Sequence, residues 1–203
     1  MTIGSSALMV RLLSLLRPAR RPVIGQEKKA LFRTASSLLA SAAARLRTLP
    51  GLQGLVEGAA ALGLFGLTAF AIHTLMSPIH FSMGLPGLRN DPDAFLRLAA
   101  IALLIPALGE ELVFRGILQP ARMSTTKDFA VSALSLAAFV LWHPVQVWLG
   151  LPMAQPVFTE PAFLTLVAAL GALCTALTHR TGSLWPAMAL HWVVVVGWKA
   201  GTG

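Results

Sequence analysis

Four stretches of the sequence, each close to twenty residues long, contain no Asp, Glu, Lys or Arg. They cover residues 58–76, 129–151, 162–178 and 181–198. A helix needs about 20 apolar residues to cross about 30 Å of hydrocarbon, and within lipid only a helix satisfies its own backbone groups. The pattern therefore predicts four membrane-spanning helices.

A fifth apolar stretch, residues 95–118, has the length of a span but carries charges. Arg97 lies near its start, and Glu110, Glu111 and Arg115 lie deep inside it. We therefore predict an all-α fold: a polytopic helical membrane bundle of about five spanning helices, of which this second one is unusual.

Basic residues gather at the start of the chain. Of its 16 Lys and Arg residues, nine precede Pro50, with a single acidic residue among them. These nine are Arg11, Arg17, Arg20, Arg21, Lys28, Lys29, Arg33, Arg45 and Arg47. A basic segment on an apolar, otherwise neutral body is attracted to an anionic cytoplasmic leaflet. We therefore divide the chain into a basic cytoplasmic or interfacial segment, residues 1–50, and an intramembrane bundle, residues 51–203.

The basic segment admits two interpretations. Leucines recur near helical spacing over residues 28–49, which favours an interfacial amphipathic helix. An acid-poor start rich in Arg and Ser also fits an organellar transit peptide. Aromatic residues are almost absent between the arginines, so we expect no nucleic-acid partner.

The charges of the loops predict the orientation of the bundle. Loops with more Lys and Arg stay in the cytoplasm, which places the N-terminus inside and the C-terminus outside. We expect an integral protein of a bacterial inner (plasma) membrane, with an organellar membrane as the alternative.

Overall composition agrees with a membrane protein. Apolar residues make up 56% of the chain and charged residues 12%, against about 25% charged residues in a typical soluble domain. The single cysteine, Cys174, excludes an intrachain disulfide and a zinc site built from several cysteines.

The charged positions inside the fifth stretch are candidates for chemistry, because an ion in lipid costs on the order of 3 kcal/mol. Glu111 and Arg115 are four residues apart with the acid first, the favourable order for an ion pair within one helix. Glu110 has no partner at helical spacing, and an unpaired carboxylate in a poorly hydrated site suits a general base. The alternative is a purely structural pair beside a neutral Glu110.

Two histidines lie in later apolar stretches, His143 before Pro144 and His191 between Leu190 and Trp192. Taken singly, each is more often a hydrogen-bonded core residue than a functional one. Together with a buried glutamate they could supply acid, base and donor in one cavity. By length along the helices the candidates differ somewhat in depth, and a kink at Pro106 or Pro144 would bring them level.

Three short motifs occur in order on three of these stretches. They are Glu-Glu-x-x-x-Arg at 110–115, Phe-x-x-x-His at 139–143 and Trp-Pro-x-x-x-x-His at 185–191. Together they resemble the CPBP family, the CAAX-protease and bacteriocin-processing intramembrane endopeptidases, also called Abi proteins. The resemblance covers about residues 95–198.

The resemblance implies a glutamic-type intramembrane endopeptidase, acting on a membrane-embedded or lipidated peptide or protein. By analogy, Glu110 would deprotonate a water held between it and His143. Glu111 and Arg115 would keep the helix and the cavity in register, and His191 would donate to the developing oxyanion or to the leaving amine. No cofactor is expected. Zinc is the second choice, because Glu110 and the two histidines could bind it.

The chain departs from the family pattern at one position. The family usually has Asn or Asp four residues after the last histidine, and here that residue is Val195. We predict that Gln146, three residues after His143, supplies the missing oxyanion donor. Alternatively, Gln146 only satisfies backbone groups freed by Pro144.

Two other functions stay open at this stage. Val195 also fits a catalytically impaired, Abi-like membrane binding or immunity protein. A transporter with Glu110 as its proton site is the third possibility, although the absence of an internal repeat argues against a carrier.

Overall fold

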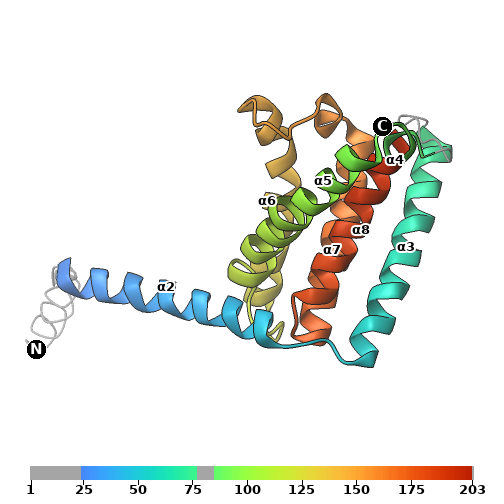
Figure 1. The fold of residues 1–203 in the computed structure, drawn as a ribbon. Coiled ribbons are helices and arrows are strands. Elements are labelled where there is room, and N and C mark those ends of the chain that lie inside the picture. The colour runs from blue at the N-terminus through green and yellow to red at the C-terminus, as the bar shows by residue number, and fades with distance from the viewer. Residues whose placement is uncertain (1–23, 77–84, 203) are drawn as a thin grey trace, which may run out of the picture. The chain divides into compact units, whose positions relative to one another are not determined.

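The structure is a computed structural model that describes residues 24–76 and 85–202 (Figure 1). These residues form helices, turns and loops, with no strand among them. In chain order the helices are α2 (Ile24–Arg47), α3 (Leu52–Met76), α4 (Pro86–Asn90), α5 (Pro92–Ala102), η1 (Leu103–Glu110), η2 (Leu112–Ile117), α6 (Thr126–Trp148), η3 (Pro156–Thr159), α7 (Pro161–Thr181) and α8 (Trp185–Thr202). The predicted all-α fold class is confirmed.

Three helices are long and apolar enough to cross a membrane: α3, α6 and α7. They coincide with three of the four uncharged stretches, so the chain is a helical membrane protein. The count of about five spans stays a prediction.

Two compact units divide the chain, residues 1–36 and residues 37–203. Of the predicted basic segment, residues 1–23 lie outside the described residues. Residues 24–36 are helical, and the remainder of α2 belongs to the same unit as the bundle. The expected interfacial position of this segment stays a prediction.

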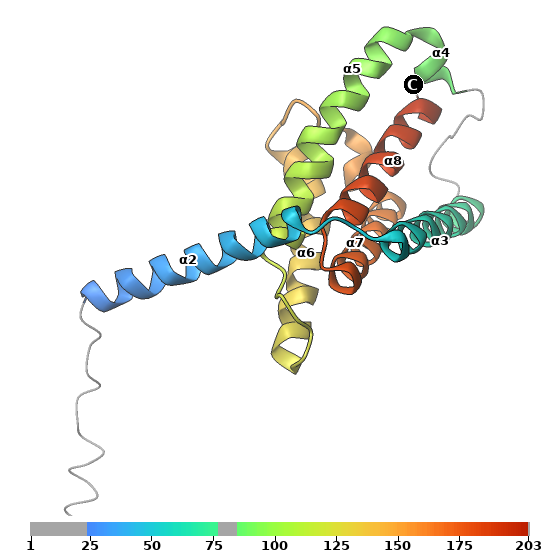
Figure 2. The same ribbon diagram turned by 60° about the horizontal axis from the view of Figure 1, so that its bottom comes forward.

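Within the second unit, α7 packs against α3, α6 and α8. The last helix, α8, lies between α3 and the helical run formed by α5 and η1 (Figures 1 and 2). This arrangement brings the Glu110 region, the His143 helix and the His191 helix together around α7.

The stretch that carries Glu110 is one continuous helical run from α5 through η2. Asp91 caps its start by accepting a hydrogen bond from the backbone N–H of Ala94 (2.8 Å), and Pro92 occupies the first turn, where its missing N–H costs nothing. From Leu103 onward the run has π-helical spacing, seen for example in the 2.9 Å bond from Leu118 N–H to the Val113 carbonyl. Short π-helical segments in proteins are frequently found at functional sites.

The boundary between α7 and α8 lies further along the chain than the uncharged stretches predicted. The stretch 181–198 was expected to be one helix, but α7 continues to Thr181 and α8 begins only at Trp185. Gly182 has a φ of 66°, a left-handed conformation that ends a helix and that glycine adopts without strain. The loop between the two helices is therefore short and begins at this glycine.

Candidate active site

Glu111 is the centre of a buried ionic cluster. Its Oε1 lies 3.0 Å from Nη1 of Arg115 and 2.9 Å from Nδ1 of His191. The side chains of Glu111 and Arg115 are both 1% exposed. The ion pair predicted from the spacing of these two residues is therefore present, and His191 joins it from α8.

Two further contacts hold Arg115 in place. Its Nη2 donates to the Gly171 carbonyl on α7 (2.9 Å), and its guanidinium carbon lies 4.1 Å from the centre of the Phe139 ring. A Cβ atom on Gly171 would come within 2.9 Å of both Arg115 Nη2 and the Phe139 ring, and within 2.6 Å of Leu136 Cδ1. Only glycine allows α7 to approach this closely, so Gly171 is part of the support of the site.

Glu110 points to the same region but has different partners. Nε1 of Trp142 donates to its Oε1 (3.2 Å), so Glu110 has a donor from α6 that helical spacing could not reveal. Its Oε2 is buried and has no hydrogen-bond partner among the described residues. This oxygen lies 4.0 Å from Nε2 of His191.

The ring of Phe139 lies between His143 and the ionic cluster and contacts both. The rings of His143 and His191 both contact Phe139 edge-on, with centroids 5.2 and 5.8 Å from the Phe139 centroid. Nδ1 of His143 lies 3.0 Å from the Phe139 carbonyl. Because a carbonyl only accepts, this nitrogen donates, and Nε2 of a neutral His143 is left as an acceptor.

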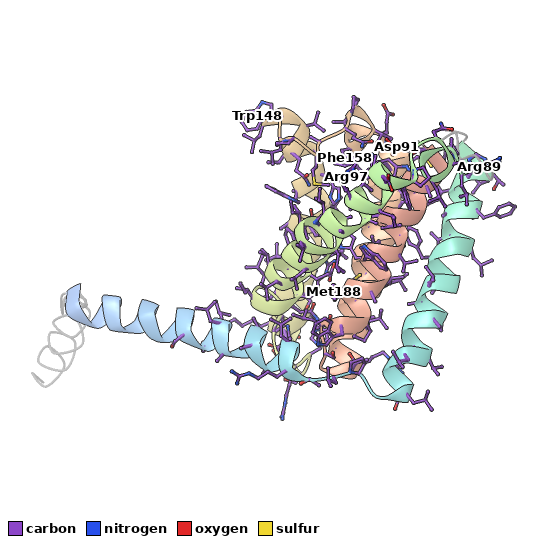
Figure 3. The ribbon with its side chains drawn as sticks, in the orientation of Figure 1. Arg89, Asp91, Arg97, Trp148, Phe158 and Met188 are labelled. Atoms are coloured by element: carbon purple, nitrogen blue, oxygen red, sulfur yellow. The ribbon has the colours of Figure 1, made fainter. Side chains whose placement is uncertain are left out.

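Aromatic side chains cover the other side of His143. Its ring centroid lies 5.5 Å from that of Phe158 and 5.8 Å from that of Phe163. Phe158 and Phe163 are stacked with centroids 4.9 Å apart, and both contact Trp198. Figure 3 labels Phe158, which lies in η3. Such surroundings keep bulk water away from His143.

Gln146 lies on the same helix as His143 and is buried. Among the described residues, its side chain forms no hydrogen bond with Glu110 or His191. Of the residues singled out from the sequence, the structure thus joins Glu110, Glu111, Arg115 and His191 directly. It places His143 beside them across Phe139.

Whether this site binds zinc, the second choice from the sequence, stays a prediction. In the described part of the chain, no three His, Cys, Asp or Glu side chains are grouped so that they could hold a metal ion. Oε1 of Glu111 is already engaged by Arg115 and His191.

Several supporting residues could not be recognised as such from the sequence. Trp142 and Gly171 contact the charged cluster from α6 and α7, and neither has a distinctive spacing to it. The one available signal was the position of Trp142 next to His143 in the sequence.

Apolar helices with buried carboxylates, an arginine and histidines between them define an integral membrane protein with a polar site inside its bundle. Residues 92–197, slightly more than half of the chain, match the family described as type II CAAX prenyl endopeptidase, Rce1-like. The chain belongs to this family of CAAX protease-like hydrolases, in agreement with its CPBP-like motifs. No curated protein and no solved structure matches the chain.

Proposed function

We propose that this protein is an intramembrane endopeptidase in which Glu110 activates the attacking water. The observation that carries the proposal is the unpartnered, buried Oε2 of Glu110, 4.0 Å from Nε2 of His191. A carboxylate oxygen that is free of hydrogen bonds from the described residues and lies beside a histidine is what a general base for water requires. The substrate is a membrane-embedded or lipidated peptide or protein.

In the proposed reaction, Glu110 takes a proton from water while the water oxygen bonds to the scissile carbonyl carbon. His143 helps to orient this water through the acceptor at Nε2. Nε2 of His191 donates a hydrogen bond to the developing oxyanion or to the leaving nitrogen. The carbon–nitrogen bond then breaks as the nitrogen takes up the proton that Glu110 removed from water, which returns Glu110 to its carboxylate form, and the products are a carboxylic acid, which ionises, and an amine.

Glu111 and Arg115 have a supporting role in this proposal. Glu111 accepts from Nδ1 of His191 (2.9 Å), which fixes the ring so that Nε2 faces Glu110. Arg115 neutralises Glu111 and ties it to α7 through the Gly171 carbonyl. Removing either residue would misdirect His191 as well as strand a buried charge.

The proposed reaction needs no metal. Treatment of the purified enzyme with a chelator is expected to leave peptidase activity unchanged. Stoichiometric zinc in the protein, with activity restored only by adding zinc back, would refute this part of the proposal and favour zinc-assisted hydrolysis.

We also propose the predicted placement in the membrane: about five spans, a cytoplasmic N-terminus with a basic interfacial segment, and a bacterial inner membrane. The basic residues before Pro50 support this orientation. Reporter proteins fused to the two ends of the chain test it.

A catalytically impaired binding or immunity protein is the second candidate, and Val195 favours it. This residue stands where relatives usually have an amide or acid, and valine cannot donate to an oxyanion. The two functions differ in whether Glu110 is needed for turnover.

The decisive experiment compares Glu110→Gln with the matched variant Glu160→Gln, which changes an exposed residue at the start of α7. A quenched, farnesylated CAAX peptide serves as the probe, and comparison of membrane-protein termini in cells identifies natural cleavage. Glu110→Gln should lower kcat by at least about 10²-fold, the usual contribution of a general base, with unchanged accumulation. Equal termini and rates in both variants would favour the binding protein.

A further inference from the structure

The C-terminal end of α2 contacts the helix that carries Glu110 and Glu111. Arg45 is 6% exposed, although the sequence groups it with the basic residues expected at a membrane surface. Its Nη1 donates to the backbone carbonyls of Arg115 and Gln119, and its Nη2 donates to that of Pro120 (2.7 Å). Arg45, which the sequence places with the membrane-surface charges, is therefore buried, and it caps the C-terminal end of η2.

The carbonyl of Arg115 needs such a partner because of the local helix spacing. In the π-helical pattern of this segment, the carbonyl of residue 113 pairs with the N–H of residue 118. The corresponding partner of Arg115 would be residue 120, which is a proline and has no N–H. Arg45 supplies the missing donor, and its charge also suits the negative end of a helix.

The last turn of α2 and the residue that follows it hold the start of the helix that carries His191. The backbone N–H of Leu184 donates to the Arg45 carbonyl (3.2 Å), and Nε1 of Trp185 donates to the Leu46 carbonyl (2.8 Å). Oγ of Ser183 donates to the Thr48 carbonyl (2.6 Å). All three donors lie in or next to the short loop between α7 and α8.

The approach between these elements is close. A Cβ atom on Gly116 would lie 3.3 Å from Cβ of Ala42 on α2 and 3.4 Å from Cδ1 of Leu184. Gly116 follows Arg115 directly, so the end of η2, the end of α2 and the start of α8 meet at one point. Arg45 contributes contacts to both other elements at this junction.

We propose that Arg45 is a positioning residue of the peptidase, which holds the Glu110–Glu111 helix and the His191 helix in register through this junction. The proposal rests on the proposed function for its effect on turnover. The Arg45 side chain donates to the carbonyl of Arg115, which lies one helical turn after Glu111. The backbone carbonyl of Arg45 accepts from Leu184, which lies about two turns before His191. A shift at the junction therefore changes the contacts of His191 with both glutamates.

The choice of arginine follows from its shape. A guanidinium presents several donors in a planar fork and can serve three carbonyls at once, whereas a lysine ammonium is a single compact charge. Burial lowers the pKa of the Arg45 guanidinium, but arginine stays charged in proteins. Lysine at this position should retain part of the contacts.

The experiment compares Arg45→Met and Arg45→Lys with Arg47→Met, which removes the same charge from an exposed position two residues further along α2. The probe is the quenched, farnesylated CAAX peptide, with kcat and KM measured separately. Misplacement of catalytic groups by about 1 Å can cost about 10²-fold. Arg45→Met should therefore lower kcat by about 10- to 100-fold with little change in KM, and Arg45→Lys should recover part of the loss. Arg47→Met should behave as wild type.

A second readout does not depend on peptidase activity. Cys174, the single cysteine, is fully buried, and its Sγ lies 3.5 Å from the Ala187 carbonyl on α8. Loosening of α8 should increase the rate at which a maleimide labels this thiol. We expect faster labelling in Arg45→Met than in Arg47→Met, and this comparison stands even if the wild-type protein cleaves no peptide.

Equal kcat and equal labelling in Arg45→Met and Arg47→Met would overturn the proposal. If Arg45→Met does not accumulate, Ser183→Ala tests the junction from the α8 side by removing the hydrogen bond to Thr48. It should give a smaller decrease in kcat and a smaller increase in labelling. Unchanged values of both in Ser183→Ala would equally refute the role of the junction.

Discussion

Replacement of Gly171 by alanine tests how tightly the site is built. The added Cβ would lie 2.6 Å from Leu136 Cδ1, and 2.9 Å from Phe139 Cδ1 and from Arg115 Nη2. Leu136 can rotate away at small cost. Phe139 is fully buried and packed against three other rings, and Arg115 is held by Glu111, so these two neighbours have little freedom to move.

The expected loss follows from two contributions. Overpacking a well-filled core costs about 1–3 kcal/mol. Displacing Arg115 also weakens its hydrogen bond to the Gly171 carbonyl, and bonds to charged groups contribute about 1.5–3 kcal/mol. The better helix propensity of alanine offsets up to about 1 kcal/mol. We therefore expect Gly171→Ala to lower the free energy of unfolding by about 2 kcal/mol or more.

The assay is SDS-induced unfolding in mixed detergent–lipid micelles, followed by circular dichroism. The matched control is Gly66→Ala on α3, because a Cβ there has no neighbour within 4 Å. Gly66→Ala should be as stable as wild type or slightly more stable. If Gly171→Ala unfolds at the same SDS fraction as Gly66→Ala, the close approach of α7 to Arg115 and Phe139 does not exist as described.

Three further variants test individual contacts of the site. Arg115→Ala strands the Glu111 carboxylate in a buried position, so we expect a loss of about 3–5 kcal/mol in unfolding free energy; accumulation and melting like wild type would contradict this. Trp142→Phe keeps an aromatic ring but removes the donor to Glu110. It should lower kcat by about 10-fold, which is near the free energy of one hydrogen bond to a charged group, with little change in melting temperature. Gln146→Leu should lower kcat by about 10²-fold if its amide binds the oxyanion.

Two controls make these kinetic predictions specific. Trp148→Phe changes an exposed tryptophan at the end of α6 (Figure 3) and should leave kcat unchanged, whereas equal effects of the Trp142 and Trp148 variants would exclude a role for the bond to Glu110. Val195→Asn in the Gln146→Leu background should restore part of the rate. A wild-type rate in Gln146→Leu alone would remove Gln146 from the site.

Features that depend on one segment alone could be predicted from the sequence. The uncharged stretches marked α3, α6 and α7, because a span is defined by length and lack of charge. The pairing of Glu111 with Arg115 followed from their separation of four residues, which places both on one helix face.

Features that depend on how helices meet could not be predicted. Trp142 donates to Glu110 from another helix, and Glu111 shares one oxygen between Arg115 and His191. Periodicity within a segment carries no information about such contacts. For the same reason, Arg45 could not be distinguished in the sequence from the other basic residues before Pro50.

The boundary between α7 and α8 shows a different limit. Absence of charge marks residues that can lie in lipid, but it does not mark where a helix ends. The apolar run simply continues across Gly182, whose left-handed backbone makes the break, and the charged residue Lys199 still lies within α8.

The π-helical spacing from Leu103 to Ile117 has a consequence for how this gene can tolerate change. A π-helical turn holds one residue more than the α-helical turn it replaces, so a single-residue deletion can be absorbed when one turn reverts to α-helical spacing. Within an ordinary α-helix such as α7, the same deletion turns every later side chain by about 100° relative to those before it. Deletion of the exposed Val113 would leave Glu111 and Arg115 three residues apart, a spacing that still places both on one helix face. In-frame loss of this codon should therefore be tolerated better than in-frame loss of a codon in the middle of α7.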